Sequence, residues 1–149
     1  MNILPKIFIY FTLIALTYAD DDGMTVKDIA EALTSFGEDC EPKPEEEHII
    51  EVIKNVKDAQ YTSKCFRHCL MAQFDLIAEG SQTMDKDRTL DMMGSMFSDR
   101  KDDLAEIIDD CNAKNQAIAD KCENAHAHGM CMLDQMKERG FDIPDLKDE

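Results

Sequence analysis

The sequence predicts an all-α protein, a six-helix, disulfide-stapled single domain that encloses an apolar cavity. Three observations lead to this prediction. Apolar residues recur at three- and four-residue spacing along almost the whole chain. No run alternates apolar and polar residues as a half-buried strand would, and no hairpin signal appears. Finally, six cysteines are spread over 149 residues, an even number that is typical of a disulfide framework.

The first residues are typical of a secretory signal peptide. Lys6 precedes the apolar run 7–16, and Thr17 and Ala19 put small residues before a cleavage site. The apolar run is too short to span a bilayer. A buried N-terminal helix is disfavoured, because an acidic run begins at Asp20. We predict a signal peptide over 1–19 and a secreted, extracellular domain over 20–149.

The charge of the chain limits its partners. The formal net charge is −16, and it becomes −17 when Lys6, the one charged residue of 1–19, is removed (−16 − 1). A field of this sign repels nucleic acid and anionic membrane surfaces. No later segment approaches the roughly 18 apolar residues of a membrane helix. We expect no nucleic-acid partner and no stable membrane insertion.

All six cysteines follow the predicted cleavage site, so an oxidising compartment predicts three disulfides among 15 possible connectivities. Cys65 and Cys69 are four residues apart and project side by side from a helix. They should therefore bond to two other segments and not to each other. A redox pair would favour C-x-x-C, and a zinc site would favour paired knuckles, which His68, His126 and His128 do not complete. We expect no metal and no cofactor.

The first three expected helices occupy the N-terminal half. The first begins after Thr25, a suitable N-cap with Asp28 three residues later. The segment 41–44 breaks the chain, and Pro44 is suited to begin the second helix. The third is expected from about Thr62 to Glu79. It is apolar on both flanks, which predicts a central position.

The other three helices are expected over 88–97, 101–118 and 119–139, and Gly140 should end the last of them before a partly apolar tail. His126 lies on the apolar stripe of the sixth helix. A hydrogen-bonded core histidine is the ordinary interpretation, and a titrating switch is the functional alternative.

The cysteine spacing resembles that of a known family. It reads C-x24-C-x3-C-x41-C-x10-C-x8-C, and its most specific parts are the gaps Cys65–Cys69 and Cys122–Cys131. With the signal peptide and six helices, it is similar to the six-cysteine subgroup of the insect odorant-binding proteins, the pheromone- and general-odorant-binding superfamily. The resemblance implies the pairs Cys40–Cys69, Cys65–Cys122 and Cys111–Cys131.

The resemblance also implies a function. It predicts a secreted carrier that reversibly binds small hydrophobic molecules, odorants or pheromones, in sensory fluid. A chemosensory receptor is a possible further partner, and the protein is expected as a monomer or homodimer. The alternative is a non-sensory member of the scaffold, an interaction protein of venom, saliva or reproductive fluid.

Methionines crowd the fourth and sixth helices, and flexible thioethers suit an adaptable pocket. From helical faces and the layout of the resembled family, the candidate ligand-binding residues are Met71, Phe74, Met93, Phe97, Ile108, Met132, Met136 and Phe141. Phe141 and Ile143 could form part of a lid.

Enzyme signatures are missing from the sequence. It has no G-x-S-x-G elbow and no H-E-x-x-H. The segment 85–96 fails as a calcium loop, because Leu90 replaces the turn glycine and Met96 the closing glutamate. His68 is followed by Cys69 and not by the aspartate that a phospholipase-like site would need. We therefore expect no catalytic activity.

Overall fold

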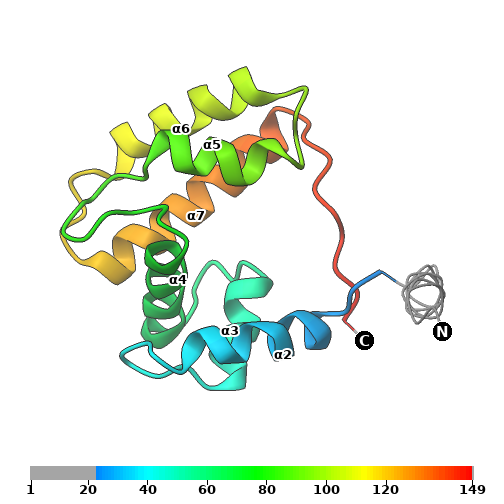
Figure 1. Ribbon diagram of the computed structural model, residues 1–149, viewed down its shortest axis with the longest axis vertical. Coiled ribbons are helices and arrows are strands. Elements are labelled where there is room, and N and C mark those ends of the chain that lie inside the picture. Colours follow the sequence, from blue (N-terminus) through cyan, green and yellow to red (C-terminus); the bar gives the residue numbers. More distant parts are fainter. Residues whose placement is uncertain (1–22, 149) are drawn as a thin grey trace, which may run out of the picture.

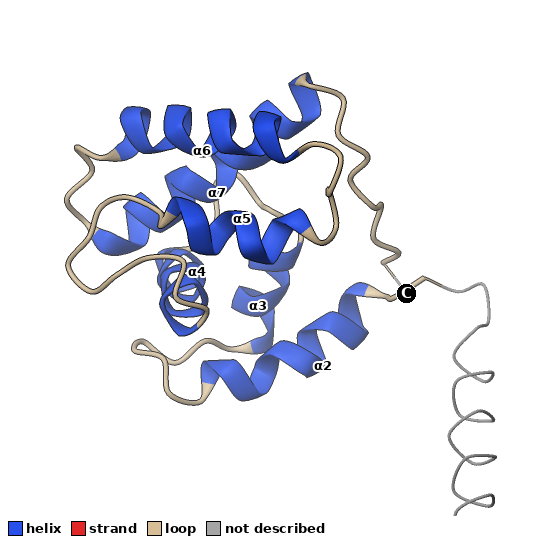
Figure 2. Cartoon of the chain, turned by 45° about the horizontal axis from the view of Figure 1, so that its top comes forward, coloured by secondary structure: helices blue, strands red, loops and turns tan. Residues whose placement is uncertain are grey.

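The computed structural model describes residues 23–148, so the predicted signal peptide and its cleavage site lie outside the described residues. Figure 2 shows helices joined by loops throughout this range and no strand. Two isolated β-bridges join Thr25 to Lys147 and Ile77 to Met84. The prediction of six helices in an all-α fold is confirmed. The helices are α2 (Val26–Gly37), α3 (Glu46–Ile53), α4 (Tyr61–Gln73), α5 (Lys86–Gly94), α6 (Lys101–Asn115) and α7 (Lys121–Glu138).

Helix α4 joins two halves of the molecule. It packs against α2 and α3 on one side and against α7 on the other, and α7 packs against α6, which packs against α5 (Figure 1). Among the described residues, no Cα atom of α2 or α3 lies within 8 Å of one in α5, α6 or α7. The predicted central position of the third helix is confirmed.

The first two helices begin with local hydrogen bonds. Thr25 caps α2 in a capping box, because Asp28 N donates to Thr25 Oγ1 (3.1 Å) and Thr25 N donates to Asp28 Oδ2 (3.1 Å). Helix α3 begins two residues after Pro44, because Glu45 takes the N-cap position and its N–H donates to His48 Nδ1 (2.9 Å). Pro44 instead packs against Gly37, where an added Cβ would lie 2.7 Å from the proline ring.

The prediction that the third helix continues to Glu79 is wrong. Helix α4 ends at Gln73, because Asp75 adopts a left-handed conformation (φ 57°). Asp75 N then donates to Ala72 O (3.1 Å), and Leu76 N donates to Met71 O (2.8 Å). These two bonds form a Schellman motif with aspartate in the position that glycine usually takes. Leu76 and Ile77 are still buried, but in a loop.

The last three helices are shifted slightly from their expected ranges. Asp85 and Asp120 are the N-caps of α5 and α7, and each accepts backbone hydrogen bonds from the first turn. Helix α6 begins at Lys101 as expected and ends three residues before Ile118. Gly140 ends the sixth helix as predicted, with φ 72° and Phe141 N donating to Met136 O (3.0 Å).

Three disulfides connect these elements. Cys40–Cys69 ties the loop after α2 to α4, Cys65–Cys122 ties α4 to α7, and Cys111–Cys131 ties α6 to α7. They are the three pairs that the resemblance implies, and no cysteine of residues 23–148 is free. Of these three disulfides, only Cys65–Cys122 joins α4 to the half formed by α5, α6 and α7.

The C-terminal tail connects the halves a second time. It leaves the end of α7 and runs past the side opposite α4 to the start of α2 (Figure 1). There Val26 N donates to Lys147 O (2.9 Å), and Lys54 Nζ lies 2.6 Å from Asp148 Oδ1. The hydrogen bond from Lys54 lowers the pKa of Asp148.

Candidate functional site

The apolar core is divided into two clusters. The first, called here the α5–α7 cluster, is buried in the half formed by α5, α6 and α7; its members are Met84, Leu104, Ile107, Ile108, Cys111, Met132, Met136 and Phe141, with the partly buried margin Met71, Leu90, Met93, Phe97, Cys131 and Ile143. The second, the α2–α4 cluster, consists of Ala30, Cys40, Ile49 and Phe66, with the margin Leu33, Ile50, Val52, Ile53, Cys69 and Leu70.

Seven of the eight candidate ligand-binding residues fall in the α5–α7 cluster. Four are buried, namely Ile108, Met132, Met136 and Phe141, and three lie at its margin, namely Met71, Met93 and Phe97. The Phe97 and Phe141 rings meet edge to face with centroids 5.3 Å apart, and the Arg100 guanidinium lies 4.1 Å from the Phe141 ring centre. Phe141 of the tail is therefore packed into this half.

Phe74 is not brought to the other seven residues. It occupies the C-cap of α4, where the helix ends early, and its side chain rests against Phe36 with ring centroids 5.5 Å apart. It remains 41% exposed. The structure thus separates Phe74 from the cluster, because the expected helical stripe stops before it.

A pocket of about 430 Å³ lies between the two halves. Ile53 from the margin of the α2–α4 cluster and Ile143 from the margin of the α5–α7 cluster both line it. Val26 of α2, Leu133 of α7 and the tail residues Pro144 and Leu146 add further apolar wall. Pockets of a few hundred cubic ångströms are typical of small-molecule sites, and this one combines the apolar side chains with about as much polar surface from residues such as Lys54, Asn55 and Lys137.

Charged groups stand at the rim of this pocket. Lys54 and Lys137 line it together with Asp145 and Asp148, and Lys54 is paired with Asp148 as described above. A second pocket of about 450 Å³ shares Val26, Lys54 and Asp148 with the first. The tail therefore forms part of the wall at the position where the sequence suggested a lid.

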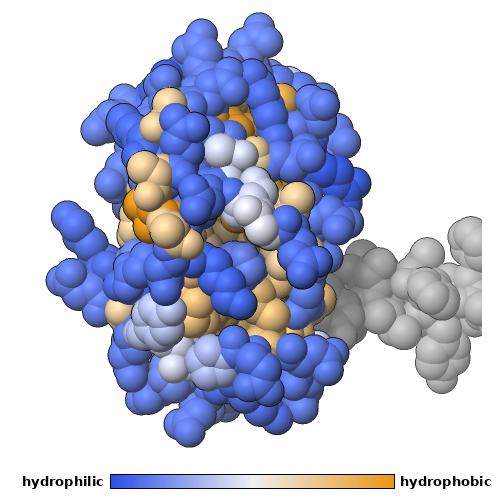
Figure 3. All heavy atoms as spheres, turned by 90° about the vertical axis from the view of Figure 1, so that its left-hand side faces the viewer, coloured by the Kyte–Doolittle hydropathy of each residue, from blue (hydrophilic) through white to orange (hydrophobic). Residues whose placement is uncertain are grey.

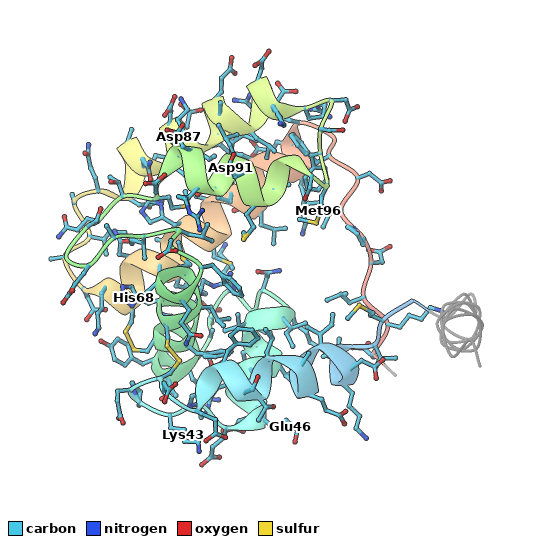
Figure 4. All side chains as sticks on the ribbon, viewed as in Figure 1. Lys43, Glu46, His68, Asp87, Asp91 and Met96 are labelled. Carbon is cyan, nitrogen blue, oxygen red and sulfur yellow. A yellow bond between two sulfur atoms is a disulfide. The ribbon has the colours of Figure 1, made fainter. Side chains whose placement is uncertain are left out.

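The outer face of α4 carries a separate hollow. Figure 3 shows it as an apolar floor inside a hydrophilic rim. Pockets of about 550 and 580 Å³ lie on this face and share His68, Ala72 and Lys121. His68 projects outward from α4 (Figure 4), and burial, followed by the charge of Lys121, lowers its pKa. None of the seven grouped candidates lines either of these two pockets or the pocket between the halves.

Two other histidines are part of the packing. His126 is buried, and its Nε2 lies 2.8 Å from Lys57 O, which agrees with the ordinary interpretation of a hydrogen-bonded core histidine. His128 is fully buried with Nε2 3.0 Å from Gln82 O, while its Nδ1 has no partner. Burial lowers the pKa of His128.

Sequence reasoning missed several lining residues. Ile53 and Leu133 lie on the apolar stripes of their helices, so their periodicity was a usable signal. Lys54 and Asn55 carried no such signal, because they lie at the end of helix α3.

No group of three or more His, Cys, Asp or Glu side chains within residues 23–148 is placed to hold a metal ion. None of the described helices has the length and apolar composition needed to cross a membrane.

Comparison with known proteins decides the family. A model of the PBP/GOBP family matches residues 22–135. The chain belongs to the PBP/GOBP family. This family is one of odorant- and pheromone-binding proteins and not of enzymes. The matched range contains all six cysteines and excludes the tail, so the membership of the chain in the family does not depend on the tail.

One relative of this chain is General odorant-binding protein 19d of Drosophila melanogaster, which is 24% identical over 101 residues. The alignment covers 66% of this chain and 66% of that relative, so the chain spans just under two thirds of the length of the relative. No solved structure was found to match the chain.

Proposed function

We propose that the protein is a secreted carrier that reversibly binds small, mostly apolar molecules, odorants or pheromones, in extracellular sensory fluid. Membership of the PBP/GOBP family supports a binding role. The observation that carries the proposal is the pocket between the halves, which is lined by margin residues of both apolar clusters, Ile53 and Ile143. Such a site binds by burial and leaves its ligand chemically unchanged.

Burial supplies enough free energy for the expected affinity. Apolar area contributes roughly 25 cal/mol per Å², and ordering of the ligand and of side chains offsets part of this. Micromolar binding requires about −8 kcal/mol. A ligand with about a dozen buried carbons is sufficient at about 0.8 kcal/mol each. Loss of one apolar contact surface should therefore be measurable as weaker binding.

Displacement of a fluorescent naphthylamine probe by a panel of apolar compounds tests the proposal. The unaltered protein should bind the probe with about micromolar affinity. Phe97→Asp should weaken binding strongly, because it puts a charge at the margin of the α5–α7 cluster beside Phe141. Met96→Asp is the matched control, since Met96 is 67% exposed and belongs to neither cluster.

Far-UV circular dichroism of both variants should retain the helical signal, because the disulfides are untouched. If Phe97→Asp stays folded and binds every compound as the parent does, Phe97 is not part of the binding surface. If the parent binds no apolar compound in the panel, the carrier proposal fails and the secreted interaction protein replaces it. Secretion is tested separately, by the mass of the product released from an insect cell, which should begin at Asp20.

A further inference from the structure

Helix α4 has one face against which no other described helix packs. It contacts α2 and α3 on one side and α7 on another, and its outer face remains open (Figure 1). The two pockets on this face share His68, Ala72 and Lys121, so they form one continuous hollow. No residue of the hollow lines the pocket between the halves, and the hollow is therefore a separate site.

Small side chains give the hollow its apolar floor. Ala72 of α4, Ala78 of the following loop and Ala119 before α7 are all exposed, and all three line it. Single exposed apolar residues are ordinary on a protein surface, whereas an apolar patch inside a polar rim is typical of an interaction site.

The walls of the hollow are held in place by bonds within the described chain. Cys65 and Cys69 line it, and disulfides fix both of them to other segments. On the opposite wall, Gln82 O accepts a hydrogen bond from Asn124 Nδ2 (3.0 Å) and lies 3.0 Å from His128 Nε2, so the loop is fastened to α7. A preformed site binds without the cost of ordering its own loops.

Carboxylates line both parts of the hollow. Asp39 and Glu41 line one of the two pockets, and Asp75 and Glu79 line the other. Asp75 lies 3.3 Å from Arg88. Asp39, Glu41 and Glu79 have no ion pair with any other residue of 23–148. Each part of the hollow therefore attracts a cation.

The region shared by the two pockets offers hydrogen-bond donors instead. The Lys121 ammonium has no ion pair within residues 23–148, and the ring nitrogens of His68 have no hydrogen bond there. Burial, followed by the charge of Lys121, lowers the pKa of His68, so the ring is neutral near pH 7 and one of its nitrogens donates. A matching ligand has acceptors and apolar groups in its middle and a cation at each end.

An extended polypeptide segment has this pattern, because its backbone carbonyls are acceptors and its side chains alternate in direction. Cys65 and Gln73 are eight residues apart, so α4 rises about 12 Å between them, a length that about four extended residues cover. A second copy of this chain is disfavoured, because its net charge is also strongly negative. The hydrogen bond of Val26 to Lys147 holds the ends of the described chain on the side opposite α4 (Figure 1).

We propose that the hollow on the outer face of α4 docks a segment of a partner protein, an extended stretch of apolar residues with a lysine or arginine on either side. The apolar side chains cover Ala72 and its neighbours, and the two cations pair with Asp39 and Glu79. Lys121 donates to a backbone carbonyl of the segment. The negative field of the chain steers such a partner toward it.

Selection of short random peptides displayed on phage, against the full disulfide-bonded protein, tests the docking role. The selected sequences should share an apolar stretch between two basic residues. A synthetic peptide with a selected sequence should bind with about micromolar affinity by fluorescence anisotropy. In NMR spectra of the protein, this peptide should shift the amide signals of His68, Ala72 and Gly80 and leave that of Ile53 unchanged.

Two pairs of variants locate the bound peptide. Ala72→Trp fills the hollow and should weaken peptide binding about tenfold or more, whereas Ala113→Trp, at an exposed alanine near the end of α6 that lines neither pocket, should not. Glu79→Lys should weaken binding about fivefold. Asp91→Lys changes the net charge equally at an exposed site on α5 (Figure 4) and should have little effect.

The outcomes separate this docking role from the carrier function. If the selected peptides share no pattern or carry acidic ends, or if Ala72→Trp binds the peptide as the parent does, the docking role is refuted and the carrier function stands. If Ala72→Trp abolishes binding of the naphthylamine probe, the hollow is a small-molecule site and the docking role is wrong. Loss of the peptide alone, with the probe still bound, supports the docking role.

Discussion

The two apolar clusters differ in the side chains that they offer to a ligand. The α5–α7 cluster and its margin contain five methionines, Met71, Met84, Met93, Met132 and Met136. The α2–α4 cluster contains none in its described members, and its margin is dominated by leucine and by β-branched residues such as Ile50, Val52 and Ile53. Methionine has an unbranched, flexible side chain, whereas β-branched residues are restricted at χ1.

This difference indicates that the two clusters have different roles. The α5–α7 cluster can change shape by changing methionine rotamers at low cost, although none of its methionines lines the pocket between the halves. The α2–α4 cluster keeps one shape, because its side chains have few rotamers. The pocket between them therefore has adaptable packing behind Ile143 and fixed packing behind Ile53.

The connection between the halves gives the largest expected effect. Replacing both Cys65 and Cys122 by serine removes the bridge between α4 and α7, which closes a sequence separation of 57 residues. The chain-entropy relation predicts a loss of about 4 kcal/mol in the free energy of unfolding. The same change at Cys111 and Cys131, with a separation of 20 residues, should cost about 3 kcal/mol.

Urea unfolding of the two double variants measures which disulfide contributes more to the free energy of unfolding. Peptide mapping of the unaltered protein is the companion check, since it should recover Cys65 with Cys122 and Cys69 with Cys40. A larger loss from the Cys111–Cys131 pair would show that strain or residual structure outweighs loop entropy.

Acid should weaken the α7 side of the molecule. His128 is buried with an unpartnered Nδ1, so protonation would bury an N–H without an acceptor. Its folded pKa is below the ordinary value of 6.5, and the unfolded chain therefore binds the proton first as pH falls. Stability is complete above about pH 6.5 and declines below it, by at most about 1.4 kcal/mol per pH unit for one group.

Unfolding free energies measured at about pH 7.5 and about pH 5.5 provide the test. His128→Gln should flatten this dependence while keeping a donor for Gln82 O. His68, whose pKa is also lowered, contributes with the same sign, so His68→Gln should flatten it further. An unchanged slope in His128→Gln would mean that other groups control the acid response.

Exchanging side-chain types between the two clusters tests their roles directly. Met93→Ile should narrow the range of compounds bound, because it stiffens the margin of the α5–α7 cluster. Ile53→Met should broaden that range. Hydrophobic exchanges of similar volume change the unfolding free energy by less than about 1.5 kcal/mol, so differences in binding across the panel can be attributed to the pocket. If the parent and both variants bind the same range of compounds, the roles assigned to the two clusters are wrong.

The smallest expected effect concerns the end of α4. Asp75 adopts a positive φ that glycine accepts without strain. Asp75→Gly should therefore raise the free energy of unfolding by up to about 1 kcal/mol, less the contribution of the exposed Asp75–Arg88 pair, which is small. Thermal unfolding measures the change. Destabilisation would show that the carboxylate matters more than the backbone conformation.

Much of this architecture was predictable because it follows from periodicity and local caps. Thr25 with Asp28, and Gly140, marked helix ends that the structure retains. The end of α4 was not predictable, because Asp75 takes a conformation that its residue type adopts only occasionally. Its apolar successors Leu76 and Ile77 also continued the helical pattern into what is a buried loop.

The candidate ligand-binding residues stay a prediction, because none of the eight lines the pocket between the halves. Helical faces brought seven of the eight candidates to one cluster, and Phe74 was lost with the end of its helix. Lys54 and Asn55 could not be found in this way. Both lie where α3 ends, and a helix end has no period in the sequence.

The hydrogen bond between Val26 and Lys147 brings the two ends of the described chain together. A short linker could therefore join these ends, and new ends could be opened at the exposed residues 78–80 of the loop between α4 and α5, with every helix and disulfide retained. The same proximity has a practical consequence. An affinity tag placed after Asp148 would lie beside Lys54 at the rim of the pocket, so binding constants should be measured after such a tag has been removed.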